Sequence, residues 1–168
     1  APMPPWAMRL PKMKGTGAAG FAGEASVWMP AAGPIVAAIV AQLALSISRA
    51  VERGNDVGTI VVNFFSFFTI LSNAASAVVL AWAAIWYFRR GARAKSEPHG
   101  LAIALASVTT YMIVTGLVYN TLLRNIELPQ GSEPIPWSNE MLHVVAPIFL
   151  LLDLFLGPLR RRLNWSAV

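Results

Sequence analysis

The run from Val57 to Phe88 is strongly apolar and contains no charged residue. A helix of about 20 apolar residues already crosses the hydrocarbon core of a bilayer, so this run predicts a membrane-spanning helix. Composition agrees, because 56% of the 168 residues are hydrophobic and 12% are charged, whereas a soluble domain has about twice that share of charge. The sequence therefore predicts an all-α, polytopic membrane protein rather than a water-soluble enzyme.

Two further features of the composition limit the classes of function. The chain has no cysteine, which excludes disulfides, thiolate nucleophiles and cysteine-ligated metals. Its formal net charge is +5, but the basic residues are confined to segments between and beyond the apolar runs. We therefore predict membrane lipids rather than nucleic acid as partners. The sequence gives no sign of a bound cofactor or metal, and it does not indicate an oligomeric state.

Four hydrophobic segments are predicted to cross the membrane as helices, at residues 27–47, 57–88, 100–123 and 138–159. Before them, residues 1–26 are rich in Ala, Gly and Pro and predict a flexible basic tail. After them, residues 160–168 form a basic end in which Trp165 is typical of the start of a further span. Because the chain also lacks an initiator methionine, we expect a fragment of a larger helical bundle.

The first of these segments is the least regular, because Pro30 and Pro34 interrupt its first turns. A cleaved signal peptide is the alternative interpretation, since basic residues precede an apolar run. However, Ser48, Arg49 and Ala50 make a poor cleavage site, and the preceding tail is long for a signal peptide. We therefore expect a retained span.

The lysine and arginine residues alternate between the two sides of this predicted topology. The N-terminal tail, the loop after the second span and the C-terminal end contain ten of them. The opposite side contains three, which are Arg49, Arg53 and Arg124. Because cytoplasmic loops of membrane proteins have an excess of Lys and Arg, we predict a cell-membrane protein with both ends of this chain in the cytoplasm.

A stripe of polar residues runs along the second apolar segment. Its members are Asn63, Ser66, Thr69, Ser72, Asn73 and Ser76. A helix advances about 100° per residue, so all of them fall on roughly half of its circumference. Lipid does not favour such a stripe, whereas helix contacts and cavities do, which makes this face a candidate functional site. A threonine hydroxyl ordinarily bonds the carbonyl one turn earlier, and it becomes a nucleophile only beside a base.

His143, at the start of the fourth span, is the candidate base. An ionisable residue in the hydrophobic zone is a functional candidate by default, although an interfacial histidine satisfied by Glu140 or a loop carbonyl is the alternative. An aromatic belt at Trp82–Tyr87 marks one end of the second span, and counting back about 20 residues puts its other boundary near Phe67. This count brings Thr69 close to the level of His143, provided that the second helix overhangs the membrane or tilts.

Other polar residues of the spans are candidates for supporting roles. Asn73 and Asn139 are amide donors for a developing oxyanion. Asp153 lies about 15 Å along the helix from His143, so we expect it in helix packing or a buried polar network. On the third span, packing is the expected role of three residues that share one face, Ser107, Tyr111 and Thr115. His99 is expected to be a solvated loop residue, and the outer end of the third span is marked by Tyr119, Asn120 and Arg124.

Three motifs on successive spans carry a resemblance to a known family. They read NFFSFFTILSN at 63–73, TGLVYNTLLR at 115–124 and MLHVVAPIFLLLDLF at 141–155. In that order they resemble a bacterial family of integral membrane proteins, which is similar to the animal androgen-induced membrane proteins and the androgen-dependent regulator of tissue factor pathway inhibitor. The resemblance covers about Leu43 to Trp165.

The resemblance implies a transmembrane threonine hydrolase. The animal relatives cleave fatty acid esters of hydroxy fatty acids with a threonine nucleophile and a histidine, which fall here on Thr69 and His143. The acidic residue that follows the histidine in the family falls on Asp153. The chain departs from the family in lacking its further spans, and in having Tyr119 followed by Asn120 where bacterial relatives often have tyrosine followed by histidine.

Two classes of function follow from these observations. The first is a lipid ester hydrolase in which His143 removes the proton of Thr69. The second is a non-enzymatic membrane protein, such as a small-molecule binder, a transport component or a structural partner, whose polar stripe holds helices together. A third interpretation, haem or quinone binding by His143, requires for axial haem ligation a second well-placed histidine, and His99 lies on the wrong side.

Overall fold

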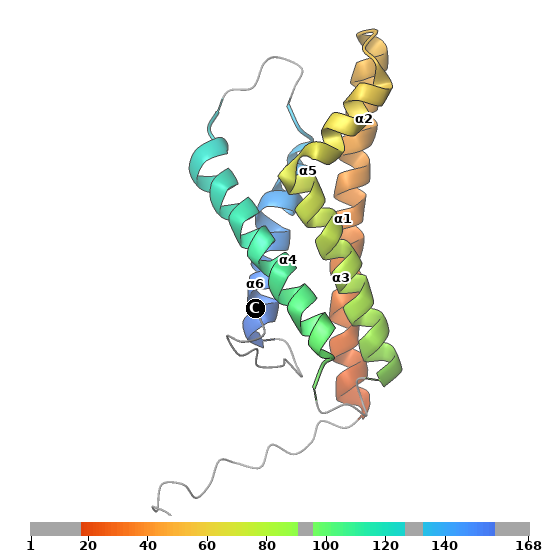
Figure 1. Ribbon diagram of the computed structural model, residues 1–168, viewed down its shortest axis with the longest axis vertical. Helices are drawn as coiled ribbons and strands as arrows, with labels where there is room; N and C mark the ends of the chain where they lie inside the picture. The colour runs from red at the N-terminus through yellow and green to blue at the C-terminus, as the bar shows by residue number, and fades with distance from the viewer. Residues whose placement is uncertain (1–17, 91–95, 127–132, 157–168) are drawn as a thin grey trace, which may run out of the picture.

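The computed structural model describes residues 18–90, 96–126 and 133–156, and every regular element in these ranges is a helix (Figure 1). In chain order the elements are α1 (Ala18–Glu52), α2 (Val57–Ser66), α3 (Phe68–Arg90), α4 (His99–Val118), η3 (Tyr119–Leu123), α5 (Pro136–Glu140), η4 (Met141–Val145) and α6 (Ala146–Leu156). The two η elements are single turns of π-helix. They continue α4 and join α5 to α6.

Four helical segments in the described ranges are long and apolar enough to cross a membrane. They are Ala31–Glu52, Phe68–Arg90, His99–Leu123 and Pro136–Phe155. Large apolar side chains point outward from them, and Val78 and Phe155 are 70% and 75% exposed. Lipid is the environment that accepts such a surface. The predicted fold class, an all-α multi-pass membrane protein, is confirmed.

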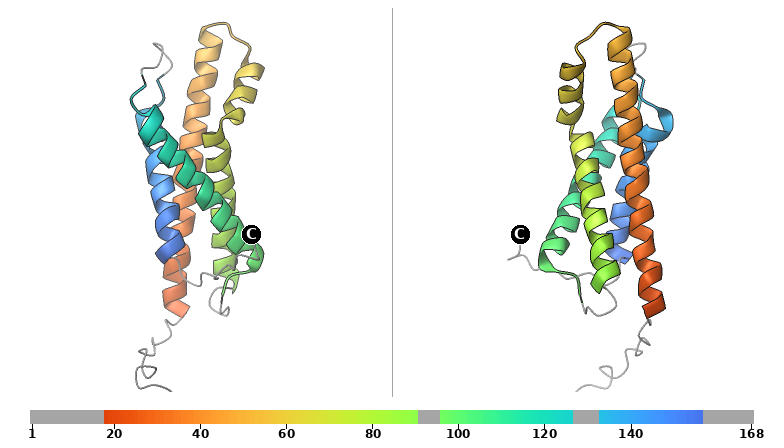
Figure 2. Two further views of the ribbon diagram at one scale, coloured as in Figure 1. Left: turned by 60° about the vertical axis from the view of Figure 1, so that its left-hand side comes forward. Right: turned by 90° about the vertical axis from the view of Figure 1, so that its right-hand side faces the viewer.

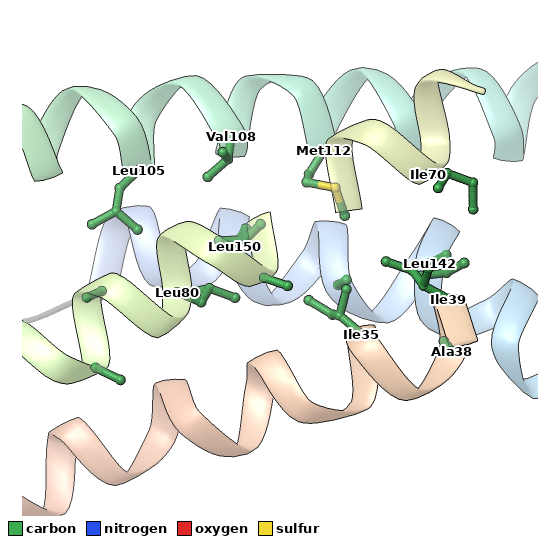
Figure 3. Packing of buried hydrophobic residues seen from close by; sticks show 14 of the residues in the cluster. Ile35, Ala38, Ile39, Ile70, Leu80, Leu105, Val108, Met112, Leu142 and Leu150 are labelled. Atoms are coloured by element: carbon green, nitrogen blue, oxygen red, sulfur yellow. The ribbon is translucent and has the colours of Figure 1, made fainter. Parts of the chain in front are cut away.

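The helices pack around a small core in the middle of the bundle. α3 lies between α1 and α4, and α6 packs against α4 (Figures 1 and 2). Fully buried side chains from each of these helices meet at the centre, as Figure 3 shows for Ile35, Leu80, Leu105 and Leu150. Most of the bundle's cohesion therefore comes from apolar packing between helices, as expected of membrane helix bundles.

The first helix differs from its prediction. α1 begins at Ala18, so residues 18–26, which we predicted to be a flexible tail, are helical. Pro30 and Pro34 lie within the helix instead of interrupting it. A proline is tolerated in an apolar helix, because lipid offers the remaining backbone groups no alternative to the helical hydrogen bonds. The rest of the predicted tail and the basic end at 160–168 lie outside the described residues.

The second apolar run forms two helices rather than one. Phe67 has φ −72° and ψ 128°, an extended conformation that ends α2 and lets α3 begin at Phe68. The Ser66 hydroxyl donates to the Val62 carbonyl oxygen at 2.8 Å, a bond that commonly bends helices. The membrane-crossing part of the run therefore starts next to Phe67, where counting back from the aromatic belt placed its boundary.

The short helix α2 folds back along the end of α1. Gly54, at φ +66°, makes the turn, and Asp56 caps α2 by accepting from the Thr59 N–H at 2.6 Å. Hydrogen bonds from the Thr59 side chain and backbone hold the pKa of the Asp56 carboxyl below its usual range. The α1–α2 hairpin projects beyond the other helices (Figure 2). α2 thus leads the chain back to the point where α3 enters the bundle.

Candidate functional site

Thr69 lies in the first turn of α3, directly after the break at Phe67. Its hydroxyl oxygen Oγ1 is 3.3 Å from Nε2 of His143. Other hydroxyls on these helices, such as those of Ser76 and Thr110, donate to the carbonyl one turn earlier. For Thr69 that carbonyl belongs to Phe65, in the preceding helix, on the other side of the break. The break therefore releases this hydroxyl from its ordinary local partner and directs it to the histidine.

The tautomer of His143 follows from its second nitrogen. Nδ1 is 2.9 Å from the backbone carbonyl oxygen of Asn139, and a carbonyl can only accept. Nδ1 therefore holds the proton, and in the neutral ring Nε2 presents its lone pair to the Thr69 hydroxyl. The pair has the arrangement of a nucleophile, a base and a group that orients the base.

The ring of Tyr119 packs against the face of the His143 imidazole. Its ring stacks on that of His143 with a centroid distance of 3.9 Å and an interplanar angle of 24°. The Tyr119 hydroxyl oxygen also accepts a hydrogen bond from the side-chain amide of Asn139. Asn139 thus contacts both rings, through its backbone carbonyl and its side chain, and this limits rotation of His143.

Both stacked residues lie on π-helical turns, which often occur at functional sites. Pro147 has no N–H and so cannot donate to the His143 carbonyl four residues earlier. That carbonyl accepts from the Asn120 side-chain amide at 3.2 Å. Gly116 lets the two helices approach this closely, since a Cβ there would lie 3.0 Å from Pro147 Cβ.

Asn73 links the segment that contains Thr69 to the segment that contains His143. Its side chain is fully buried, and Nδ2 donates to the carbonyl oxygens of Thr69 at 2.9 Å and Leu142 at 3.1 Å. Both amide protons are therefore used, so this arrangement leaves none for an oxyanion. The Asn139 amide uses one of its two protons to donate to the Tyr119 hydroxyl oxygen. Both asparagines help to fix the positions of Thr69 and His143.

The polar stripe predicted on the second span divides at the break. Ser72, Asn73 and Ser76 are buried on α3, whereas Asn63 and Ser66 are exposed on α2. Ser72 Oγ lies 2.9 Å from Thr115 Oγ1 on α4 and also donates to the Thr69 carbonyl. Since a hydroxyl has one proton, Thr115 is the donor of this pair. The buried part of the stripe therefore links α3 to its neighbours.

A cavity of about 230 Å³ opens beside the Thr69–His143 pair. It lies between α1, the end of α2 and the start of α5, and most of its surface is apolar. Its walls include Gln42, Phe64, Phe67 and Leu142 in addition to the pair itself. The first backbone N–H groups of α3 have no acceptor within their own helix. The cavity thus adjoins a hydroxyl, a base and the start of a helix whose dipole favours negative charge.

Several residues singled out in the sequence lie elsewhere. Asp153 is buried on α6, well along the helix from His143, and does not line the cavity. Tyr111, which we expected on a packing face with Thr115, is 46% exposed and touches Phe68 edge-on. His99 is the first residue of α4 rather than a loop residue. Tyr111 therefore packs against α3 at the surface of the bundle, whereas the buried hydroxyls of α4 are those of Thr109 and Thr115.

Sequence reasoning placed Tyr119 and Asn120 only at the end of a span and gave them no part in the site. Their spacing from His143 gives no local signal, since the contacts depend on where η3 meets η4. Gly116 and Pro147 were the available clues, because a glycine and a proline within apolar helices often mark close approach or a freed carbonyl. No cluster of three or more His, Asp or Glu side chains suited to a metal occurs in the part of the chain that the structure describes.

Comparison of the chain with protein-family models, curated proteins and solved structures finds no match.

Proposed function

We propose that this chain is a membrane-embedded hydrolase of lipid esters, of the kind that cleaves fatty acid esters of hydroxy fatty acids, with Thr69 as nucleophile and His143 as general base. The observation that carries the proposal is the 3.3 Å contact between Thr69 Oγ1 and His143 Nε2, with the ring tautomer fixed by the Asn139 carbonyl. An isolated hydroxyl is a poor nucleophile, and an oriented base beside it is what activates it.

In the first half of the reaction, Thr69 Oγ1 attacks the ester carbonyl carbon while its proton moves to His143 Nε2. The resulting tetrahedral oxyanion lies near the N-terminus of α3, whose first backbone N–H groups and dipole favour negative charge. The bond from the carbonyl carbon to the alcohol oxygen then breaks. His143 Nε2 returns its proton to that oxygen, which leaves an acyl group on Thr69 and releases the alcohol.

Water completes the cycle. His143 Nε2 takes a proton from a water molecule whose oxygen attacks the acyl carbon. The bond to Thr69 Oγ1 breaks, and Oγ1 recovers the proton from Nε2 as the free fatty acid leaves. The sum of the two halves is one ester and one water converted to one acid and one alcohol.

The experiment that tests this proposal is covalent labelling with a fluorophosphonate, which reacts with an activated hydroxyl by losing fluoride. The full chain in non-ionic detergent is compared with Thr69→Ala and His143→Ala. Thr110→Ala is a matched control, because Thr110 is exposed on α4 and bonds only its own helix at Ala106. We expect labelling in wild type and the control but not in the two site variants, with turnover of a long-chain ester following the same order.

Labelling of Thr69→Ala at the wild-type rate would exclude Thr69 as the nucleophile. An unlabelled, folded wild type that also leaves esters intact would favour the second class of function. The helix-spanning bonds of Ser72 with Thr115 and of Asn73 with Leu142 support that class specifically, because they use the polar stripe to hold α3 against its neighbours. The chain would then bind a small molecule or a partner protein, and Thr69→Ala would change its stability rather than a reaction.

We also propose the orientation in which both ends of the chain are cytoplasmic. It rests on the excess of Lys and Arg on that side of the spans. The candidate site, near the α1–α2 hairpin, would then lie toward the outer face of the cell membrane.

A further inference from the structure

The cavity beside Thr69 adjoins a second one between α1 and α2. The second cavity has a volume of about 330 Å³. The two share four wall residues, which are Gln42, Ser46, Phe64 and Phe67. Because the same side chains line both, the two cavities are neighbours, and we refer to them together as the groove: one part lies beside the Thr69–His143 pair and the other between the helices of the projecting hairpin.

The chemistry of the groove changes along its length. Beside Thr69 the walls include the aromatic rings of Phe64 and Phe67, which suit a hydrocarbon chain. At the far end the walls include Arg49 and Arg53 together with the amides of Asn55 and Asn63. No carboxylate lines either cavity among the residues that the structure describes. The groove thus has an apolar end at the reactive pair and a cationic end at the hairpin.

Of the two arginines, Arg49 is the one whose side-chain hydrogen bond defines its place at the groove. Glu52 accepts from the Ser48 hydroxyl at 3.0 Å, and Asp56 caps α2. The Arg49 guanidinium is fixed by donating to the backbone carbonyl oxygen of Glu133 at 2.8 Å. A guanidinium has five N–H donors, and a bond to a neutral carbonyl leaves its charge uncompensated. Arg49 is therefore held in place at the groove while remaining able to attract an anion.

We propose that this cationic end binds the anionic oxygens of an amphiphilic ester, either a carboxylate or a phosphate, while the chain of the ester lies along the groove toward Thr69. The inference rests on the proposed function for the ester, but the binding of the anionic group does not require turnover. The hairpin projects beyond the bundle (Figure 2), so a charged group there stays near water while the chain enters the apolar part. Arg49 is then the residue that selects anionic over neutral substrates, and Arg53 lines the same cavity beside it.

The test measures binding in the Thr69→Ala variant of the full chain, which separates recognition from reaction. The probes are dodecanoate, dodecyl phosphate and the neutral methyl dodecanoate, each displacing a fluorescent fatty acid in non-ionic detergent. Arg49→Gln with Arg53→Gln removes the cationic end. Arg89→Gln with Arg90→Gln is the matched control, because it removes the same charge from exposed residues at the other end of the bundle.

We expect the first pair of substitutions to weaken binding of the anionic probes about tenfold, which is the order expected for losing charged hydrogen bonds, and to leave the methyl ester unchanged. The control pair should change neither. The anionic probe that loses more affinity identifies whether a carboxylate or a phosphate is the natural group. In the protein that keeps both arginines, the affinity for the anionic probes should also fall as the salt concentration rises. This measurement tests the inference even where the double arginine variant does not fold.

The inference would be overturned if the arginine variants bound each anionic probe as tightly as the protein with both arginines does. Binding of the anionic probes that does not depend on salt would overturn it as well. If the anionic probes bind as expected but wild type hydrolyses no ester, the proposed function fails and the anion site stands. If wild type hydrolyses anionic and neutral esters alike and the arginine variant does the same, the proposed function stands and the anion site fails.

Discussion

Gly116 offers the sharpest test of how the bundle positions His143. A Cβ added there would lie 3.0 Å from Pro147 Cβ and 3.3 Å from the His143 carbonyl oxygen. Carbon atoms in good contact are about 3.5 to 4.0 Å apart, so Gly116→Ala would push η4 and the start of α6 away by a few tenths of an ångström. Thr69 Oγ1 and His143 Nε2 are already 3.3 Å apart, near the limit of a hydrogen bond. A shift of this size would misalign the pair.

Gly33 provides the matched control for this substitution. It lies within α1, and a Cβ there would meet nothing within 4 Å. Both glycines gain about 0.5 to 1 kcal/mol of helix stability on substitution by alanine, so this gain cancels when the two variants are compared. The remaining difference is the overpacking at Gly116, which costs about 1 to 3 kcal/mol. We therefore expect Gly116→Ala to be less stable than Gly33→Ala by about that amount.

Two measurements on both variants check this expectation. Unfolding in mixed micelles gives the stability difference, and the rate of fluorophosphonate labelling reports the alignment of the pair. A displacement of about 1 Å can lower reactivity roughly a hundredfold, so a shift of a few tenths of an ångström should slow labelling several-fold in Gly116→Ala and leave it near wild type in Gly33→Ala. Equal stability and equal labelling of the two variants would refute the idea that this close approach holds His143 in place.

Two further predictions concern the contacts around the pair. The hydroxyl bond between Ser72 and Thr115 joins α3 to α4, so a double-mutant cycle of Ser72→Ala and Thr115→Val should give a coupling free energy of about 0.6 kcal/mol and at most roughly 1.7 kcal/mol. The cycle is measured by unfolding in micelles, and a coupling free energy of zero would contradict the bond. Tyr119→Phe keeps the stacking on His143 and loses only the acceptor for Asn139, whereas Tyr119→Leu loses both. Labelling should therefore slow more in the leucine variant, and equal rates in the two would show that stacking does not orient the ring.

Several features of the candidate site were predictable before the structure. Thr69 and His143 were identified because a polar stripe and an ionisable residue are unfavourable in lipid unless they have a use. The aromatic belt indicated the depth of Thr69, and the membrane-crossing helix does begin beside Phe67. The supporting residues were less predictable. Asn73 was expected to donate to an oxyanion, yet both of its amide protons bond backbone carbonyls of two different helices.

The sequence by itself determined the fold class, because each span must form an apolar helix long enough to cross the bilayer, and the residues of that span alone satisfy this requirement. It did not determine the break at Phe67, since no proline or glycine lies there and the bend becomes favourable only when α2 packs back on α1. Nor did it determine the stacking of Tyr119 on His143. Those contacts depend on Gly116, Pro147 and two π-helical turns meeting across the bundle, and the register between helices is set by packing that no single segment contains.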